Sequence, residues 1–168
     1  MSRIRTAVVF AAMLAAHPAD AGWSIAYAPE ANLERLDVVL LDSARTSIDM
    51  AAYVLTDVAV IDALTRAAGR GVRVRIYRDV GQDRVGRAVA DHLAALVAAP
   101  SVQVRTKPGR VYMHLKSYAA DGRVLRGGAA NFSASGLKTQ DSDRVETDDA
   151  GAVAAFERKF ETMWAGGR

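Results

Sequence analysis

The chain has 168 residues, with 22 lysines and arginines against 19 aspartates and glutamates, which gives a formal net charge of +3. A charge this small does not by itself indicate a polyanionic partner. The chain has no cysteine, which excludes disulfides, thiolate metal sites and cysteine nucleophiles.

The first 21 residues have the pattern of a cleavable export signal. Two arginines form a basic start, the apolar run TAVVFAAMLAA follows, and Ala-Asp-Ala at 19–21 is a small-x-small cleavage site. This run is too short to span a bilayer comfortably, and no other apolar run of membrane-spanning length occurs, so we expect no stable membrane insertion. Cleavage after Ala21 would leave 22–168 as one domain, in the periplasm or secreted.

The remaining residues alternate between strand-like and helix-like patterns. Strands are predicted, from β-branched and alternating apolar residues, at 22–29, 46–55, 72–78, 102–106, 111–120, 123–128 and 143–148. Helices are predicted, from apolar residues at helical spacing, from Pro29 through Leu41, from an N-cap at Thr56 to Gly69, at 84–98 and at 150–165. This alternation indicates an α/β fold, and the successive strands over 101–131 indicate a mixed sheet.

The stretch HLKSYAADGRVLRGGAAN, at 114–131, combines residues that suit chemistry on a phosphate. His114 and Lys116 are two apart in a predicted strand, so their side chains should project together. The Lys116 ammonium can bind phosphate oxygens and balance charge in the transition state. The His114 imidazole can attack phosphorus or move a proton, because imidazole titrates near neutral pH. On local sequence alone, a structural histidine is the commoner alternative.

Two further polar residues of this stretch follow the predicted strand. Asp121 and the glycine after it are a turn signal. On an unbroken strand Asp121 would face away from His114 and Lys116, so we assign it a supporting role in the site, holding the turn or pairing with a nearby base. The glycine-rich loop at 127–130 can return Asn131 to the side of His114, as a second donor to the phosphate.

The spacing His-x-Lys, then Asp121 after four residues, then Gly-Ala-Ala-Asn at 128–131 resembles the His-Lys-Asp signature of the phospholipase D superfamily. Ala129 departs from it, since the family usually has serine there, and the lost hydroxyl removes about 1 kcal/mol of hydrogen bonding. The resemblance implies a mixed sheet flanked by helices on both faces and cleavage of phosphodiesters through a phosphohistidine. A single motif resembles the small bacterial endonucleases of the superfamily, which complete the site by forming a homodimer.

An acidic residue beyond the motif is a candidate partner for His114. The related endonucleases carry, after a serine, an acidic residue that hydrogen-bonds the catalytic histidine and holds its ring, and Ser142-Asp143 matches that pattern. A carboxylate in this role fixes the tautomer and stabilises the imidazolium. Asp141 is the fallback, and an exposed acid at the start of a strand is the structural alternative.

Four residues near the motif are candidate substrate contacts. Lys107 and Arg110, in the loop TKPGR, suit backbone phosphates, and the backbone amide of Gly128 is available to a phosphate oxygen. The hydroxyl of Ser133 either contacts the substrate or caps a short helix, and the cap is favoured. Neither a histidine pair nor clustered carboxylates show metal-site spacing, so we predict no metal and no cofactor.

Positive charge is concentrated in the middle of the chain. Ten lysines and arginines occur from 66 to 110, against three aspartates, and the balance reverses from 141 to 149. A basic block beside the motif fits tracking of a phosphate backbone. The alternative is a set of ordinary solvated helix and strand faces.

The sequence therefore predicts an exported, metal-independent phosphodiesterase: a nuclease of low sequence specificity that cuts DNA or RNA as a homodimer with a shared site. Two alternatives stay open. A phospholipase acting on lipid head groups would use the same chemistry. A non-catalytic member that only binds phosphate or DNA is supported by Ala129 alone.

Overall fold

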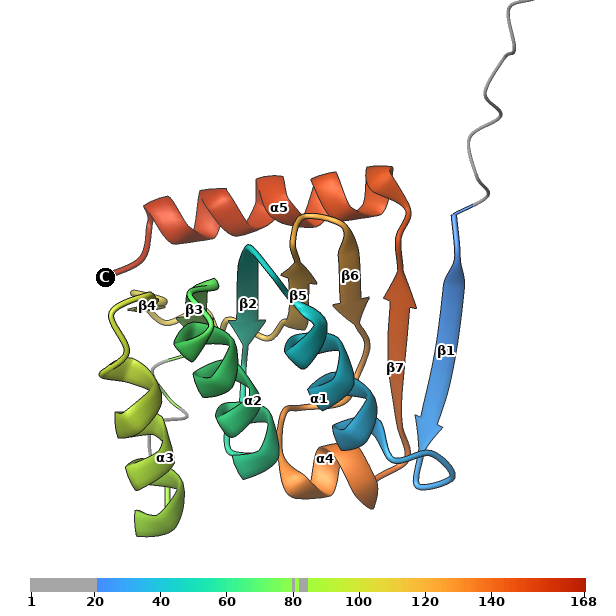
Figure 1. Cartoon of the computed structure of the whole chain (residues 1–168), viewed down its shortest axis with the longest axis horizontal. Helices are drawn as coiled ribbons and strands as arrows, with labels where there is room; N and C mark the ends of the chain where they lie inside the picture. Colours follow the sequence, from blue (N-terminus) through green and yellow to red (C-terminus); the bar gives the residue numbers. More distant parts are fainter. Residues whose placement is uncertain (1–20, 80, 82–84) are drawn as a thin grey trace, which may run out of the picture.

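The computed structural model describes residues 21–79, 81 and 85–168, so the predicted export signal at 1–21 lies outside the described residues except for its last position. A seven-stranded sheet with the order β1-β7-β6-β5-β2-β3-β4 forms the central layer (Figure 1). The strands are β1 (Trp23–Ala28), β2 (Ser47–Ala52), β3 (Arg73–Arg78), β4 (Val102–Thr106), β5 (Lys116–Ala120), β6 (Val124–Gly127) and β7 (Ser142–Thr147). β2, β3 and β4 pair in parallel and the other neighbours pair antiparallel, which confirms the predicted mixed sheet.

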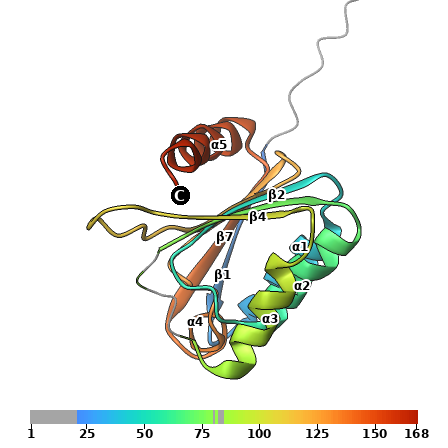
Figure 2. The same ribbon diagram turned by 90° about the vertical axis from the view of Figure 1, so that its left-hand side faces the viewer.

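Helices cover both faces of this sheet. They are α1 (Leu33–Ser43), α2 (Val58–Gly69), α3 (Arg87–Val97), α4 (Ala134–Lys138) and α5 (Ala150–Ala165). α1, α2 and α3 lie on one face and α5 lies on the other (Figure 2). None of the helices in the described part of the chain is both long enough and apolar enough to cross a bilayer.

Two predicted helix starts were wrong by one to four residues. α1 begins at Leu33 and not at Pro29, because the side chain of Asn32 accepts a hydrogen bond from the backbone of Arg35 and caps the helix. The N-cap of α2 is Asp57 and not Thr56. The backbone amides of both residues donate to the carbonyl oxygen of Phe132, at 2.8 and 2.9 Å, which places Thr56 outside the helix.

The core has two parts, one on each side of the sheet. The larger part packs α1, α2 and α3 against side chains such as Ile48 and Met50 of β2. The smaller part packs Phe156, Phe160 and Trp164 of α5 over the opposite face. Because β2 is buried on both faces, it is mostly apolar, as the sequence indicates.

The predicted strand at 111–120 is shorter in the structure, where β5 begins only at Lys116. The segment that joins β4 to β5 projects away from the sheet (Figure 2). The backbone amide of Met113 donates to the carboxylate of Asp79 at 2.8 Å instead of to a neighbouring strand. His114 therefore lies in a loop immediately before β5.

One end of the sheet collects the loops that carry the motif. The parallel strands β2, β3 and β4 end there, β5 and β7 begin there, and β6 ends there, at the lower edge in Figure 1. Ligands of open α/β sheets commonly bind beyond the carboxyl ends of the parallel strands. The topology therefore brings the segments on both sides of β5 and β6 to the expected position of a site.

Candidate active site

His114 and Lys116 are in direct contact. The Lys116 Nζ lies 3.1 and 3.2 Å from the two ring nitrogens of His114, and 2.8 Å from its carbonyl oxygen. Because the ring nitrogens point in different directions, an ammonium nearly equidistant from both cannot form an in-plane hydrogen bond with each, so it lies against the ring. His114 is exposed and Lys116 is buried. The predicted pairing is present, although His114 is outside the strand.

Tyr53, which was not predicted as a site residue, packs against both His114 and Lys116. Its ring centroid is 4.3 Å from that of His114 and 4.8 Å from the Lys116 Nζ. Burial lowers the pKa of Lys116. With few waters around it, a charged Lys116 acts more strongly on a bound anion than an exposed lysine would. The position of Tyr53, directly after the buried strand β2, is the signal that could have identified it.

A buried ionic network lies behind the site. The carboxylate of Asp37, on α1, is fully buried and accepts hydrogen bonds from Arg126 at 2.9 and 3.0 Å and from Arg144 at 2.9 Å. The hydroxyl of Tyr118 donates to it at 3.1 Å. Burial and the nearby carboxylate raise the pKa of Tyr118 well above its ordinary range. One carboxylate thus joins α1 to three strands of the sheet.

Arg126 connects this network to the motif. One of its guanidinium nitrogens donates to the carbonyl oxygens of Lys116, at 2.7 Å, and Ala130, at 3.3 Å. The guanidinium also lies over the ring of Phe132, 4.4 Å from its centroid. The start of β5 and the glycine-rich loop are therefore held by the same buried side chain.

The glycine-rich loop packs closely against β7. Gly128 has a φ of 125°, and a Cβ there would lie 2.5 Å from the carbonyl oxygen of Asp143, so both conformation and space require glycine. The amide of Ala129 donates to the Asp143 carboxylate, and the amide of Ala130 donates to the Asp143 carbonyl, each at 3.1 Å.

The prediction that Asp143 hydrogen-bonds His114 needs correction within one subunit. Among the described residues, the partner of the Asp143 carboxylate is the amide of Ala129. The reason is register: Asp143 sits on β7 beside the loop that leaves β6, so the amides of that loop are its neighbours, whereas His114 lies in the loop before β5. Asp143 therefore fixes the loop that carries the second half of the motif.

Asn131 follows this loop, and the residues after it anchor the chain. The Asn131 side-chain oxygen is buried and has no hydrogen-bonding partner among the described residues. This oxygen is therefore a buried hydrogen-bond acceptor that the fold leaves unsatisfied beside the glycine-rich loop. The hydroxyl of Ser133 accepts from the amide of Gly136 at 3.1 Å and caps α4, the role favoured from the sequence over substrate contact.

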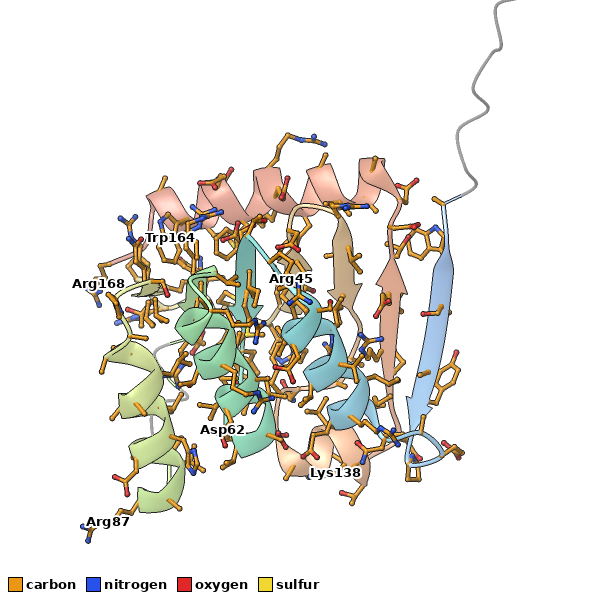
Figure 3. All side chains as sticks on the ribbon, in the orientation of Figure 1. Arg45, Asp62, Arg87, Lys138, Trp164 and Arg168 are labelled. Carbon is orange, nitrogen blue, oxygen red and sulfur yellow. The ribbon has the colours of Figure 1, made fainter. Side chains whose placement is uncertain are left out.

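Asp121 lies away from these residues, at the opposite end of β5. Its carboxylate accepts hydrogen bonds from the backbone amides of Arg45, Thr46 and Ser47, at 2.7 to 3.0 Å. Five residues of strand separate it from Lys116 by about 17 Å. In Figure 3, Arg45 lies well above the α4 residue Lys138. Asp121 therefore holds a turn and is remote from His114 and Lys116.

Much of the predicted basic block is used inside the fold. Arg66 and Arg70 pair with Asp42, Arg73 and Arg75 pair with Asp49, and Arg105 packs over Trp164. These five arginines have partners within the fold, and the side chains of Arg66 and Arg73 are each half exposed. Lys107 and Arg110 instead lie in the projecting segment, where they line a cavity of about 300 Å³.

Two acidic side chains, Glu34 and Asp57, contact Lys138 of α4, the helix that follows the motif loop. Asp57 caps α2 and lies 3.9 Å from the Lys138 Nζ, which also pairs with Glu34. Lys138 is labelled on α4 in Figure 3. Burial and the nearby Glu34 carboxylate raise the pKa of Asp57 from 3.8 to about 6. Hydrogen bonds from Lys138 and Asp57 outweigh burial at Glu34 and lower its pKa.

Replacing Asp57 by asparagine should change how stability depends on pH. A raised pKa means that the folded state binds this proton more tightly than the unfolded state, so wild type gains stability as the pH falls from 7 to 4.5 and loses it as the pH rises through 6. Asparagine keeps the helix cap and removes this gain of roughly 2 kcal/mol. Urea unfolding of both proteins at pH 4.5 and 7 measures the difference, and parallel pH profiles would contradict it.

Among the described residues, no group of three or more histidines, aspartates and glutamates is arranged to hold a metal ion. The polar groups that the motif brings to this end of the sheet are the His114 imidazole, the Lys116 ammonium, the Asn131 side chain and the backbone amide of Gly128. These are donors and a nucleophile, which suit an anionic, electrophilic phosphate.

A family model described as "Cardiolipin synthase, PLD-like domain" matches residues 38–164. The chain belongs to this family, and so to the phospholipase D superfamily. The match covers the catalytic pair, the glycine-rich loop and both arginines of the buried network. The superfamily resemblance inferred from the motif is confirmed.

Individual members of the superfamily are similar over most of the chain. Human mitochondrial cardiolipin hydrolase is 30% identical over 135 residues, which are 80% of this chain and 52% of that protein. The chain spans about half the length of the curated relatives it matches. Nuc, a phospholipase D family member from Salmonella typhimurium, superposes with a TM-score of 0.80 at 26% identity and covers 89% of this chain and 97% of its own. NucT from Helicobacter pylori, at 21% identity and a TM-score of 0.77 over 88% and 98% of the two chains, shares the fold.

Proposed function

We propose that the protein is a metal-independent phosphodiesterase that acts through a covalent phosphohistidine. The observation that carries this proposal is the contact between the buried Lys116 ammonium and the exposed His114 ring, 3.1 Å apart at the closest nitrogen. The ring is open to a substrate on the outside, and the fixed positive charge beside it attracts an anion. The side-chain amide of Asn131 and the backbone amide of Gly128 supply further donors.

The reaction has two displacement steps at phosphorus. First, a ring nitrogen of His114 attacks, the bond to the leaving oxygen breaks, and that oxygen takes a proton from His114 of the partner subunit. Then the partner's imidazole removes a proton from water, the hydroxide attacks phosphorus, and the phosphorus–nitrogen bond breaks. Lys116 and Asn131 hold the non-bridging oxygens. Proton transfer of this kind contributes about 10²- to 10⁴-fold to rate.

The second imidazole requires a homodimer with a shared site. One chain carries one motif, so two copies meeting about a two-fold axis would supply the nucleophile and the acid. The surface beside the glycine-rich loop supports such pairing. Ile25 and Tyr27 of the edge strand β1 are each 57% exposed, and with Ala129 and Asp143 they line an open cavity of about 680 Å³.

We infer that the substrate is nucleic acid and that the protein is an endonuclease of low sequence specificity. Lys107 and Arg110, in the segment that leads to His114, support contacts with flanking phosphates. The likeness to Nuc, which covers 89% of this chain and 97% of Nuc, supports a phospholipase D-type catalytic domain. The names of the cardiolipin hydrolases favour a second candidate, a lipid phosphodiesterase.

Incubation with plasmid DNA, RNA and cardiolipin vesicles, each in excess EDTA, tests this proposal. We expect nicking and then degradation of nucleic acid, with the lipid unchanged. Turnover of cardiolipin alone would replace the nuclease by the lipid phosphodiesterase. Loss of all turnover in EDTA, with recovery on adding a divalent ion, would overturn metal independence.

We also propose that the chain is exported and cleaved after Ala21. The sequence pattern of 1–21 supports this proposal. N-terminal sequencing of protein recovered from the expressing bacterium tests it, with Gly22 as the expected first residue. An N-terminus that retains the apolar run would contradict it.

A further inference from the structure

An exposed aromatic side chain lies beside the catalytic pair. Tyr112 is 70% exposed, and its ring makes an edge-to-face contact with Tyr53, at 6.4 Å between centroids and 83° between planes. Tyr53 in turn lies 4.3 Å from the ring of His114. A continuous row of three rings thus leads from the catalytic imidazole to solvent.

The same segment carries positive charge. Tyr112 shares the lining of the 300 Å³ cavity with Lys107 and Arg110, and the segment projects beyond the sheet (Figure 2). Packing does not explain this arrangement, because Tyr112 and Val111, the latter 74% exposed, are both turned to solvent. An open aromatic face among cations is the usual way to bind a flexible polynucleotide, with bases stacked on rings and phosphates on ammonium or guanidinium groups.

We propose that Tyr112 is a stacking platform for one base of a single-stranded nucleic acid, next to the phosphodiester bound by His114 and Lys116, with Lys107 and Arg110 on neighbouring phosphates. This inference rests on the proposed nuclease function. Single strands are specified because a duplex keeps its bases stacked on each other, whereas an unpaired base is free to turn onto a protein ring.

The competing interpretation is that this segment binds a membrane, since an apolar tip flanked by cations can also insert into an anionic bilayer. The structure favours the base. Val111 and Tyr112 give only two exposed apolar side chains, whereas interfacial anchors bury a whole apolar helix face. The contact of Tyr112 with Tyr53 also directs it toward the catalytic ring.

Steady-state kinetics on short oligonucleotides test the platform. The substrates are a single-stranded thymidine decamer and the same decamer with abasic sites throughout. Wild type should show a KM for the thymidine decamer that is roughly 10- to 100-fold lower than for the abasic strand. Tyr112→Leu should raise the KM for thymidine to the abasic value and leave kcat on the abasic strand unchanged. Tyr112→Phe, which keeps the ring, should behave as wild type.

The outcomes distinguish a failure of the Tyr112 platform from a failure of the proposed nuclease function. If Tyr112→Leu binds and cuts the thymidine decamer as well as wild type does, the platform is overturned while the nuclease stands. If Tyr112→Leu is unaffected but Tyr112→Ser loses turnover of cardiolipin vesicles, the segment is a membrane contact. If wild type degrades plasmid DNA but cuts neither decamer, the single-strand platform is overturned; if it cuts neither plasmid DNA nor the decamers, the nuclease function itself fails. Thermal melts of all variants exclude misfolding as the cause, since Tyr112 is exposed.

Discussion

His114→Asn should abolish phosphodiester turnover, with a fall of about 10⁴-fold or more, because it removes both the nucleophile and the acid of the proposed reaction. The fold should be unaffected, since the side chain is exposed. The matched control is His92→Asn. His92 is half-exposed on α3 and pairs with Asp62 at 2.6 Å, away from the motif, so its replacement should leave kcat within about twofold.

Plasmid degradation in excess chelator measures both variants, and a thermal melt checks each fold. If His114→Asn retains a substantial part of wild-type turnover while His92→Asn loses it, the assignment of the nucleophile is wrong.

Mixed dimers extend this prediction to the shared site. When wild type and His114→Asn are co-expressed in equal amounts, random pairing makes about one quarter of the dimers fully wild type. If both imidazoles are needed, specific activity should be about one quarter of the wild-type value. Independent sites would give about one half, and that result would refute the homodimeric mechanism.

Asp37→Ala should destabilise the protein by about 3 to 5 kcal/mol, the second large effect that we expect. The substitution leaves the buried guanidinium of Arg126 without a carboxylate partner and removes one of the two carboxylates that pair with Arg144. Asp42→Ala is the matched control. Asp42 is on the same helix and pairs with Arg66 and Arg70, but its side chain is 37% exposed, so its loss should cost at most about 1 kcal/mol.

Urea unfolding at pH 7 compares the two variants. If Asp37→Ala and Asp42→Ala lower the free energy of unfolding by similar amounts, burial does not determine how much these ion pairs contribute to stability. Arg126 also donates to the carbonyl oxygens of Lys116 and Ala130. Loss of its carboxylate partner in Asp37→Ala should therefore lower activity even at temperatures where the variant stays folded.

The parts of the site that a short stretch of sequence encodes were predictable. The contact of His114 with Lys116 follows from their spacing, and Gly128 follows from the tight loop in which it sits. The strand boundary was not predictable from 111–120, since its composition suits a strand throughout. The competing bond from Met113 to Asp79 comes from a residue more than thirty positions earlier in the chain.

The buried network was beyond prediction for a physical reason. Asp37 lies on an amphipathic helix, where a charged residue is normally on the solvated face, and its partners Arg126 and Arg144 are about a hundred positions away. The start of α2 was predicted one residue too early because threonine and aspartate both suit an N-cap, and in the structure the Asp57 side chain accepts from the amide of Val60. Long-range contacts, and not local preferences, set the buried network.

The most direct test of the central claim is to quench the enzyme during turnover and locate the covalent adduct by mass spectrometry. Trypsin should release Val111–Lys116, VYMHLK, which contains His114 as its only histidine. We predict a nucleotidyl phosphate on this peptide, stable at high pH, labile in acid and absent from His114→Asn. Sustained turnover with this peptide always unmodified, or with the adduct on another peptide, would contradict a phosphohistidine at His114.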